Sequence, residues 1–204
     1  MISFPKTGGQ KILLTLTDGS QITAKDIEML PETPLRVEAE FGATLIIPKS
    51  RLVSLRFLGG RVQYLSDLKP IEYEFTPYLS TRWPLQHDRN VLGGGLHLRG
   101  VFYPKGLGMH SKSRVTYELQ GRYSRFQSVI GIDDSAGGKG SAIFAVEVDG
   151  KRVFTSHPLT GNSPAVSIAP ISVQGCKRIS LIVEYGLLGD IRDHANWCDA
   201  VLMK

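Results

Sequence analysis

Short apolar runs that alternate with polar residues and end in glycine turns are the feature that most constrains the fold of this chain. Residues 115–119 read Val-Thr-Tyr-Glu-Leu, and residues 144–148 and 179–185 alternate in the same way. Because successive side chains of a strand point to opposite faces, each run places one apolar face on a core. With 22 glycines and 11 prolines the chain is rich in turns, and no stretch holds an extended helical period. The pattern predicts an all-β protein.

The first 65 residues predict a small domain of their own. Short apolar runs between residues 11 and 65 are separated by turns such as Asp18-Gly19 and Phe41-Gly42. Strands this short can close into an SH3-like or Sm-like barrel, which leaves no unpaired edge. The alternation then stops, and Lys69-Pro70 marks a break. We therefore expect a small β-barrel at residues 1–65 and a β-sandwich at residues 66–204.

Composition and charge limit the classes of protein to consider. The apolar stretches are too short to span a bilayer, so we expect no membrane insertion. Cys176 and Cys198 form no C-x-x-C pair and are too few for a disulfide scaffold, so we expect two free thiols. The net charge of +5 raises the alternative of a polyanionic partner, because residues 89–117 hold five basic side chains and no acidic one. A solvated basic face explains the same stretch, and we expect no nucleic-acid partner.

No standard catalytic motif is present in the sequence. It lacks a G-x-S-x-G elbow, an H-E-x-x-H helix and a G-x-x-x-x-G-K-[ST] phosphate loop. The adjacent acids Asp133 and Asp134 also do not suit a glycosidase, which holds two carboxylates across a cleft. Neighbouring residues on a strand point to opposite faces instead. We therefore expect a protein that is not an enzyme.

Three segments combine glycine turns with polar side chains: residues 105–110, 131–138 and 189–199. The candidate ligand-binding residues are His110, Asp133, Asp134, Asp193, His194 and Asn196. Carboxylate and amide groups can hydrogen bond to vicinal hydroxyls, and the indole of Trp197 could offer a flat face to a sugar ring. The alternatives are that the two neighbouring aspartates cap a turn after a strand and that Trp197 fills the core.

Together these segments resemble the NPCBM family, whose members are related to the family-51 carbohydrate-binding modules that accompany glycosidases. The resemblance lies in KGLGMHSKSRVTYEL at residues 105–119, RYSRF at residues 122–126, the run from Val129 to Phe154, and DHANWCDAVL at residues 193–202. These motifs follow the order of the family over roughly residues 68–204. They are more specific than any one short motif.

The resemblance implies a jelly-roll β-sandwich of the galactose-binding type that recognises glycans without catalysis. It also implies a possible structural calcium ion, for which Asp199 is the candidate ligand, with carbonyls of residues 78–81 completing the shell. Asn196 stands where the family usually has Asp, and Cys198 where it usually has Ala. A structural or protein-interaction module without sugar binding is the alternative.

Glycan binding implies an extracellular or periplasmic protein. Residues 1–30 show no charged segment followed by an apolar core, so we expect that any leader has been removed from this chain. If the protein has no leader segment, the alternative is an intracellular protein that binds another protein. The sequence does not specify which sugar is bound or the oligomeric state.

Overall fold

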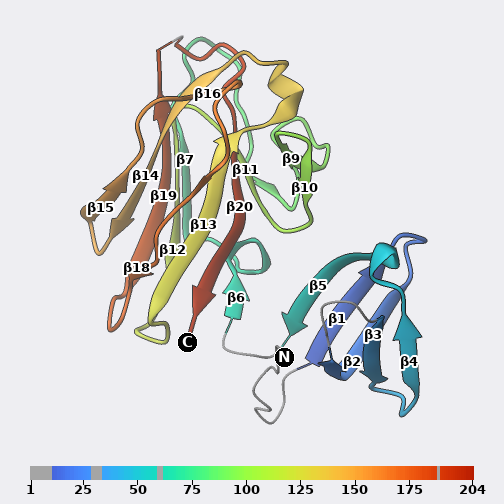
Figure 1. The fold of residues 1–204 in the computed structure, drawn as a ribbon. Coiled ribbons are helices and arrows are strands. Elements are labelled where there is room, and N and C mark those ends of the chain that lie inside the picture. Colours follow the sequence, from blue (N-terminus) through green and yellow to red (C-terminus); the bar gives the residue numbers. More distant parts are fainter. Residues whose placement is uncertain (1–10, 29–33, 59–61, 188) are drawn as a thin grey trace. The chain divides into compact units, whose positions relative to one another are not determined.

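The computed structural model describes residues 11–28, 34–58, 62–187 and 189–204, with the side chains of residue 11 and residues 54–58 excepted (Figure 1). The chain divides into two compact units, Met1–Val62 and Gln63–Lys204. No α-helix occurs in the described ranges, and three short 3-10 helices accompany the strands. The prediction of an all-β protein is confirmed.

The first unit is a five-stranded antiparallel sheet with the strand order β4-β3-β2-β1-β5. Its strands are β1 (Lys11–Leu16), β2 (Gln21–Glu28), β3 (Leu35–Ala39), β4 (Thr44–Ile47) and β5 (Leu52–Leu58). Side chains alternate between core and solvent along β3. The buried face carries Ile12, Leu14, Leu16, Ala24, Ile27, Leu35, Val37 and Ile47.

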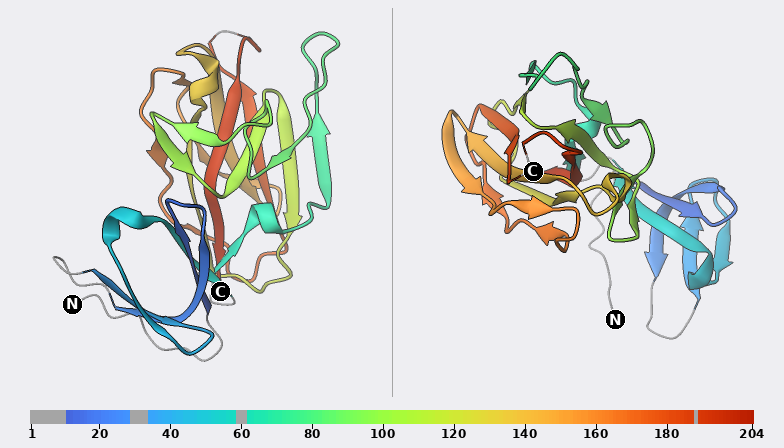
Figure 2. Two further views of the ribbon diagram at one scale, coloured as in Figure 1. Left: turned by 90° about the vertical axis from the view of Figure 1, so that its right-hand side faces the viewer. Right: turned by 90° about the horizontal axis from the view of Figure 1, so that it is seen from above.

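The closed barrel predicted for this unit is wrong. The described strand pairs form an open path, with β4 at one edge and β5 at the other. Register shifts after Ala24 and Thr15 bend the sheet, and Figure 2 shows its strong curvature. The free edge strand β4 has only four residues, so curvature and a short edge limit exposed pairing groups without closure.

The second unit is a sandwich of two antiparallel sheets. The seven-stranded sheet has the order β17 (Val166–Ser167), β13 (Arg125–Ile132), β20 (His194–Met203), β11 (Gly106–His110), β8 (Gln86–His87), with β18 (Ile171–Ser172) on β13 and β6 (Val62–Tyr64) on β20. The six-stranded sheet has the order β15 (Lys151–Thr155), β14 (Ser141–Val148), β19 (Arg178–Tyr185), β12 (Ser113–Glu118), β7 (Glu72–Phe75), with β16 (Leu159–Thr160) on β14. The predicted β-sandwich is confirmed. The run at residues 62–65, expected to belong to the barrel, instead supplies β6 to the sandwich.

Large apolar side chains fill the space between the two sheets. Trp197 on β20 is 0% exposed and packs edge-on against Phe144 of β14, with ring centroids 5.3 Å apart. Tyr117, Phe126 and the alternating apolar residues of β12, β14 and β19 share this core. The core position that the sequence offered as an alternative for Trp197 is therefore confirmed, and this indole cannot stack on a sugar.

A short hairpin, β9 (Leu96–Leu98) and β10 (Val101–Tyr103), lies beside β11 and β20 (Figure 1). Together with the loop before it, the hairpin packs on the outer face of the seven-stranded sheet. A Cβ atom on Gly108 would come within 2.3 Å of the Arg89 carbonyl oxygen, and one on Gly131 would meet Leu98 at 3.0 Å. Glycine at these two strand positions therefore permits the close approach of the covering segment.

Candidate functional site

Asp133 lies in a buried hydrogen-bond network directly after β13. Its side chain is 1% exposed and accepts from the amides of Asn90 (3.0 Å) and Asn196 (2.5 Å). It also accepts from the backbone N–H groups of His97 and Ser135, both at 2.9 Å. The bond to Ser135 caps the 3-10 helix η3 (Asp134–Ala136), as the turn-capping alternative requires. Asp133 therefore positions loops and has almost no surface to offer a ligand.

Asp134 holds the turn of the β9–β10 hairpin. Its carboxylate oxygens accept from the backbone N–H groups of Arg99 (2.8 Å) and Gly100 (2.7 Å). Arg99 has a φ of 54°, a conformation that side chains disfavour, so these bonds stabilise a strained turn. Asp134 is exposed, but both its oxygens are already engaged by the hairpin.

Asp193 is fully buried and ties three segments of the chain together. It accepts a hydrogen bond from the Ser111 hydroxyl and one of 2.8 Å from the Ser141 backbone N–H. Burial raises the pKa of Asp193 above its ordinary value, while the bonds from Ser111 and Ser141 oppose that rise. Like Asp133, this predicted ligand-binding carboxylate holds loops in place.

An aromatic cluster stands at the same end of the seven-stranded sheet. His110 of β11 and His194 of β20 are register partners, with ring centroids 6.1 Å apart. The half-buried indole of Trp83 stacks on His110 at 4.9 Å with 8° between the ring planes, and it lies 6.4 Å from His194. The structure thus brings together two of the predicted site residues. We call Trp83, His110 and His194 the aromatic cluster.

Each of the two histidines has its Nδ1 atom engaged by a neighbouring residue. His110 Nδ1 lies 2.9 Å from the Ser111 carbonyl oxygen, which requires that this nitrogen donate. His194 Nδ1 lies 3.0 Å from the Ser135 hydroxyl. These contacts fix the orientation of both rings, which are 3% and 6% exposed.

Charges around His194 favour its neutral form. Burial is the largest cause that lowers the pKa of His194, and His110 and Arg192 lower it further, against the opposing effect of Asp133. The Arg192 guanidinium is placed over η3 by a contact of 3.4 Å to the Ala136 carbonyl oxygen. A neutral imidazole has one nitrogen that donates and one that accepts a hydrogen bond, and its tautomer decides which is which.

The structure explains why an amide suits position 196. Its amide donates to Asp133, next to the donors from Asn90 and His97. An aspartate at this position would place two buried carboxylates in contact, whereas the amide supplies a donor without charge. Asn196 is fully buried, so this predicted ligand-binding residue also supports the network.

Asp199, the candidate calcium ligand, lies elsewhere on the last strand than expected. Asp199 lies in the middle of β20 rather than at its start, and its backbone N–H donates to the Lys105 carbonyl oxygen. Tyr78, from the loop expected to complete the shell, instead packs on Tyr185 at 5.7 Å. Within the described ranges no three His, Cys, Asp or Glu side chains could hold a metal together. Calcium binding at Asp199 stays a prediction.

The basic stretch at residues 89–117 is partly neutralised by ion pairs. Lys105 is only 4% exposed and contacts the carboxylates of Asp67 and Asp88. Arg114 pairs with Glu147 at 2.7 Å. Two of the five basic side chains therefore face internal partners, which weakens the polyanion alternative.

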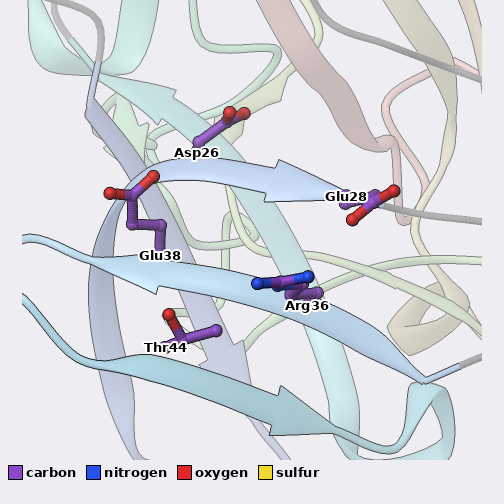
Figure 3. Close-up of a pocket in the computed structure, with 5 residues that line it drawn as sticks. All are labelled: Asp26, Glu28, Arg36, Glu38 and Thr44. Atoms are coloured by element: carbon purple, nitrogen blue, oxygen red, sulfur yellow. The ribbon is translucent and has the colours of Figure 1, made fainter.

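A separate polar pocket of about 300 Å³ opens on the sheet of the first unit (Figure 3). It is lined by Asp26, Glu28, Arg36, Glu38 and Thr44, from strands β2, β3 and β4. The carboxylates surround a single guanidinium, so the lining is acidic overall.

Trp83 is the site residue that the sequence analysis missed. It lies in the irregular segment before β8, flanked by Arg82 and Pro84, where no strand period marks it. A lone tryptophan in an irregular segment was the available signal, because such a ring has no regular strand to place it in the core.

The second unit thus combines a β-sandwich with an aromatic and imidazole cluster at one end of a sheet, and its nearby carboxylates support the loops. The profile of the NPCBM/NEW2 domain matches residues 61–203, and the chain belongs to this family. Nothing in the described ranges forms a helix long and apolar enough to cross a membrane.

Two comparisons of known structure agree with this assignment. CBM51 from Clostridium perfringens GH95, solved with methyl-galactose, is 28% identical with a TM-score of 0.63, covering 70% of this chain and 99% of that one. CBM51-2 and INT domains from Clostridium perfringens ZmpB, solved with GlcNAc, have a TM-score of 0.65 at 23% identity, covering 94% of this chain and 43% of that one. These matches confirm the predicted fold class, and the second unit is a carbohydrate-binding module.

Among curated proteins, a Renibacterium salmoninarum protein assigned as an endo-alpha-N-acetylgalactosaminidase is 37% identical over 144 residues, which are 67% of this chain and 9% of that protein. Alpha-1,3-galactosidase B of Akkermansia muciniphila is 27% identical over 115 residues, which are 55% of this chain and 14% of that protein. The matches thus cover about a tenth of the length of these relatives.

Proposed function

We propose that the second unit binds a glycan at the aromatic cluster and does not catalyse a reaction. The observation that carries this proposal is the Trp83 indole, stacked on buried His110 beside His194. His110 holds the indole from one side, so the other side can receive the C–H face of a sugar ring. The imidazoles can exchange hydrogen bonds with sugar hydroxyls, as donor or acceptor according to their tautomer.

The arrangement of the carboxylates supports binding rather than hydrolysis. A glycosidase uses one carboxyl group as an acid and another as a base or nucleophile. Here Asp133, Asp134 and Asp193 all accept hydrogen bonds from within the protein. The sugars present in the related CBM51 structures support a galactose-type or N-acetylglucosamine-type ligand. A glycan ligand in turn supports an extracellular or periplasmic location.

The test is glycan binding by the full chain and by Trp83→Ala. We expect retention on a glycan array, and calorimetry with the best glycan should show a loss of tenfold or more in Trp83→Ala, on the order of the free energy of one stacking contact. Val153→Ala, which removes an exposed apolar side chain from β15, is the matched control and should bind normally.

An array on which no glycan retains the wild-type chain would overturn the proposal. Retention that Trp83→Ala leaves unchanged would reject the aromatic cluster as the site. The exposed apolar side chains of Leu79, Leu187 and Ile191 favour the protein-interaction alternative in the first case. That alternative predicts a specific protein partner whose capture is lost when these side chains are replaced.

A further inference from the structure

A second aromatic surface lies on the β9–β10 hairpin, outside the aromatic cluster. Phe102 and His97 are register partners on its two strands, with ring centroids 5.3 Å apart. Gly95 lies beneath them, since a Cβ there would come within 3.0 Å of the Phe102 ring and 3.1 Å of the His97 ring. Phe102 is nevertheless 49% exposed. The hairpin thus presents the Phe102 ring to solvent above the backbone of Gly95, which has no side chain.

The hairpin is fixed to the sheet at several points. Leu96 and Leu98 are buried beneath it and pack with Cys198. Asp134 accepts from both turn N–H groups, and Asp133 accepts from the backbone N–H of His97. A side chain on so firmly held a backbone loses little further freedom when a ligand binds, which favours affinity.

The two aromatic surfaces lie on either side of one buried carboxylate. Asp133 accepts from the His97 N–H, and its own backbone N–H donates to the His194 carbonyl oxygen at 2.7 Å. Ser135, which Asp133 caps, contacts the His194 ring. The Phe102 and His97 pair is therefore joined to the aromatic cluster through a single network on the outer face of the same sheet.

We propose that Phe102 and His97 form a second sugar subsite, so that the ligand is an oligosaccharide of at least two residues. This inference rests on the proposed function, because it places one sugar at the aromatic cluster and the next at the hairpin. Phe102 would contact the apolar C–H face of the second sugar. The subsite would favour oligosaccharides over free monosaccharides, because each further sugar ring that is removed from water adds buried apolar surface.

The experiment compares wild-type protein, Phe102→Ala and Val101→Ala with sugars of different length. The probes are methyl-galactose, N-acetylglucosamine and the disaccharide galactosyl-N-acetylglucosamine, by calorimetry, and an array of mono-, di- and trisaccharides ending in these sugars. We expect the wild type to bind its preferred oligosaccharide on the order of tenfold more tightly than the terminal monosaccharide. Phe102→Ala should remove that difference and leave monosaccharide affinity unchanged. Val101 precedes Phe102 on β10, and its side chain points to the opposite face of the strand. Val101→Ala should therefore retain the preference for the oligosaccharide.

The outcomes separate this inference from the proposed function. Equal affinity for the monosaccharide and the longer chains, or an oligosaccharide preference that survives in Phe102→Ala, overturns the second subsite and leaves glycan binding intact. A wild-type array without any bound glycan overturns both. Circular dichroism of each variant checks that the hairpin substitutions leave the fold unchanged.

Discussion

The outer faces of the two sheets of the sandwich are built in opposite ways. The seven-stranded sheet is covered by the segment of residues 88–103, under which Asp133 and Asn196 meet in a buried network. The six-stranded sheet has a more open outer face, where Arg152 bridges Glu147 and Glu184. The outer face of the seven-stranded sheet thus holds buried, uncharged donors around a carboxylate. The outer face of the six-stranded sheet holds partly solvated ion pairs.

Backbone strain occurs at both sheets. Asp88, Arg99, Arg192 and Asp199 have positive φ angles in or next to the covered sheet, and Gln120 and Asp149 have them in turns of the six-stranded sheet. Strained residues and buried polar groups persist only where surrounding contacts hold them, and they gather at functional sites. The aromatic cluster and the hairpin both adjoin this covered face, which supports the placement of the glycan site there. The difference between the faces can be measured.

Asp133→Ala should have the largest effect on stability. The substitution removes the carboxylate acceptor of four donors, two of which, the amides of Asn90 and Asn196, make buried bonds to it. Removing one partner of a buried charged network costs about 3–5 kcal/mol, so we expect a loss of that size in the free energy of unfolding, measured by urea denaturation. Glu147→Ala on the other sheet is the matched control and should lose about 1 kcal/mol. Equal losses in the two variants would contradict the division between the faces.

His194 should make the stability of the protein depend on pH. Its pKa is lowered in the folded protein from an ordinary value of 6.5, mainly by burial, so below that pH the unfolded chain binds a proton that the folded protein does not. The free energy of unfolding should therefore decrease as pH falls from 7 to 5. His194→Asn, which keeps a polar group near Ser135, should flatten this part of the pH profile.

The control for the pH profile is His157→Asn. His157 is exposed in the loop after β15, so its replacement should leave the slope of unfolding free energy against pH as in the wild type. A wild-type slope retained in His194→Asn would show that another group titrates.

The sequence was sufficient to predict those features that depend on local pattern. Alternation placed β12, β14 and β19 in a sandwich, because one apolar face per strand has to be buried. The position of Asp133 directly after an apolar run indicated a turn cap, and the structure contains that cap. His110 and His194 were found because both lie in segments that combine glycine turns with polar side chains.

Features that depend on long-range contact could not be predicted from the sequence. Trp83 lies 27 residues before its stacking partner His110 in the sequence. The segment around Trp83 has no hydrophobic period that would show where its side chain packs. The donors of Asp133 come from three separate stretches of chain, so its sequence neighbours did not show that its oxygens are fully occupied. Barrel closure likewise depends on whether the two edge strands of a sheet pair with each other. The alternation of apolar and polar residues does not specify that pairing.

Arg152→Ala should have the smallest effect. The Arg152 side chain is 39% exposed, and its contacts to Glu184 (2.9 Å) and Glu147 (3.3 Å) lie at the solvated face. Exposed ion pairs contribute about 0–1 kcal/mol because water and side-chain entropy offset the attraction, so the free energy of unfolding should fall by less than about 1 kcal/mol. The same measurement in 1 M salt should shrink the difference between variant and wild type, since ions screen exposed charges. A loss above about 2 kcal/mol that persists in salt would show that this face also depends on a buried charge network, and the contrast between the two sheets would fail.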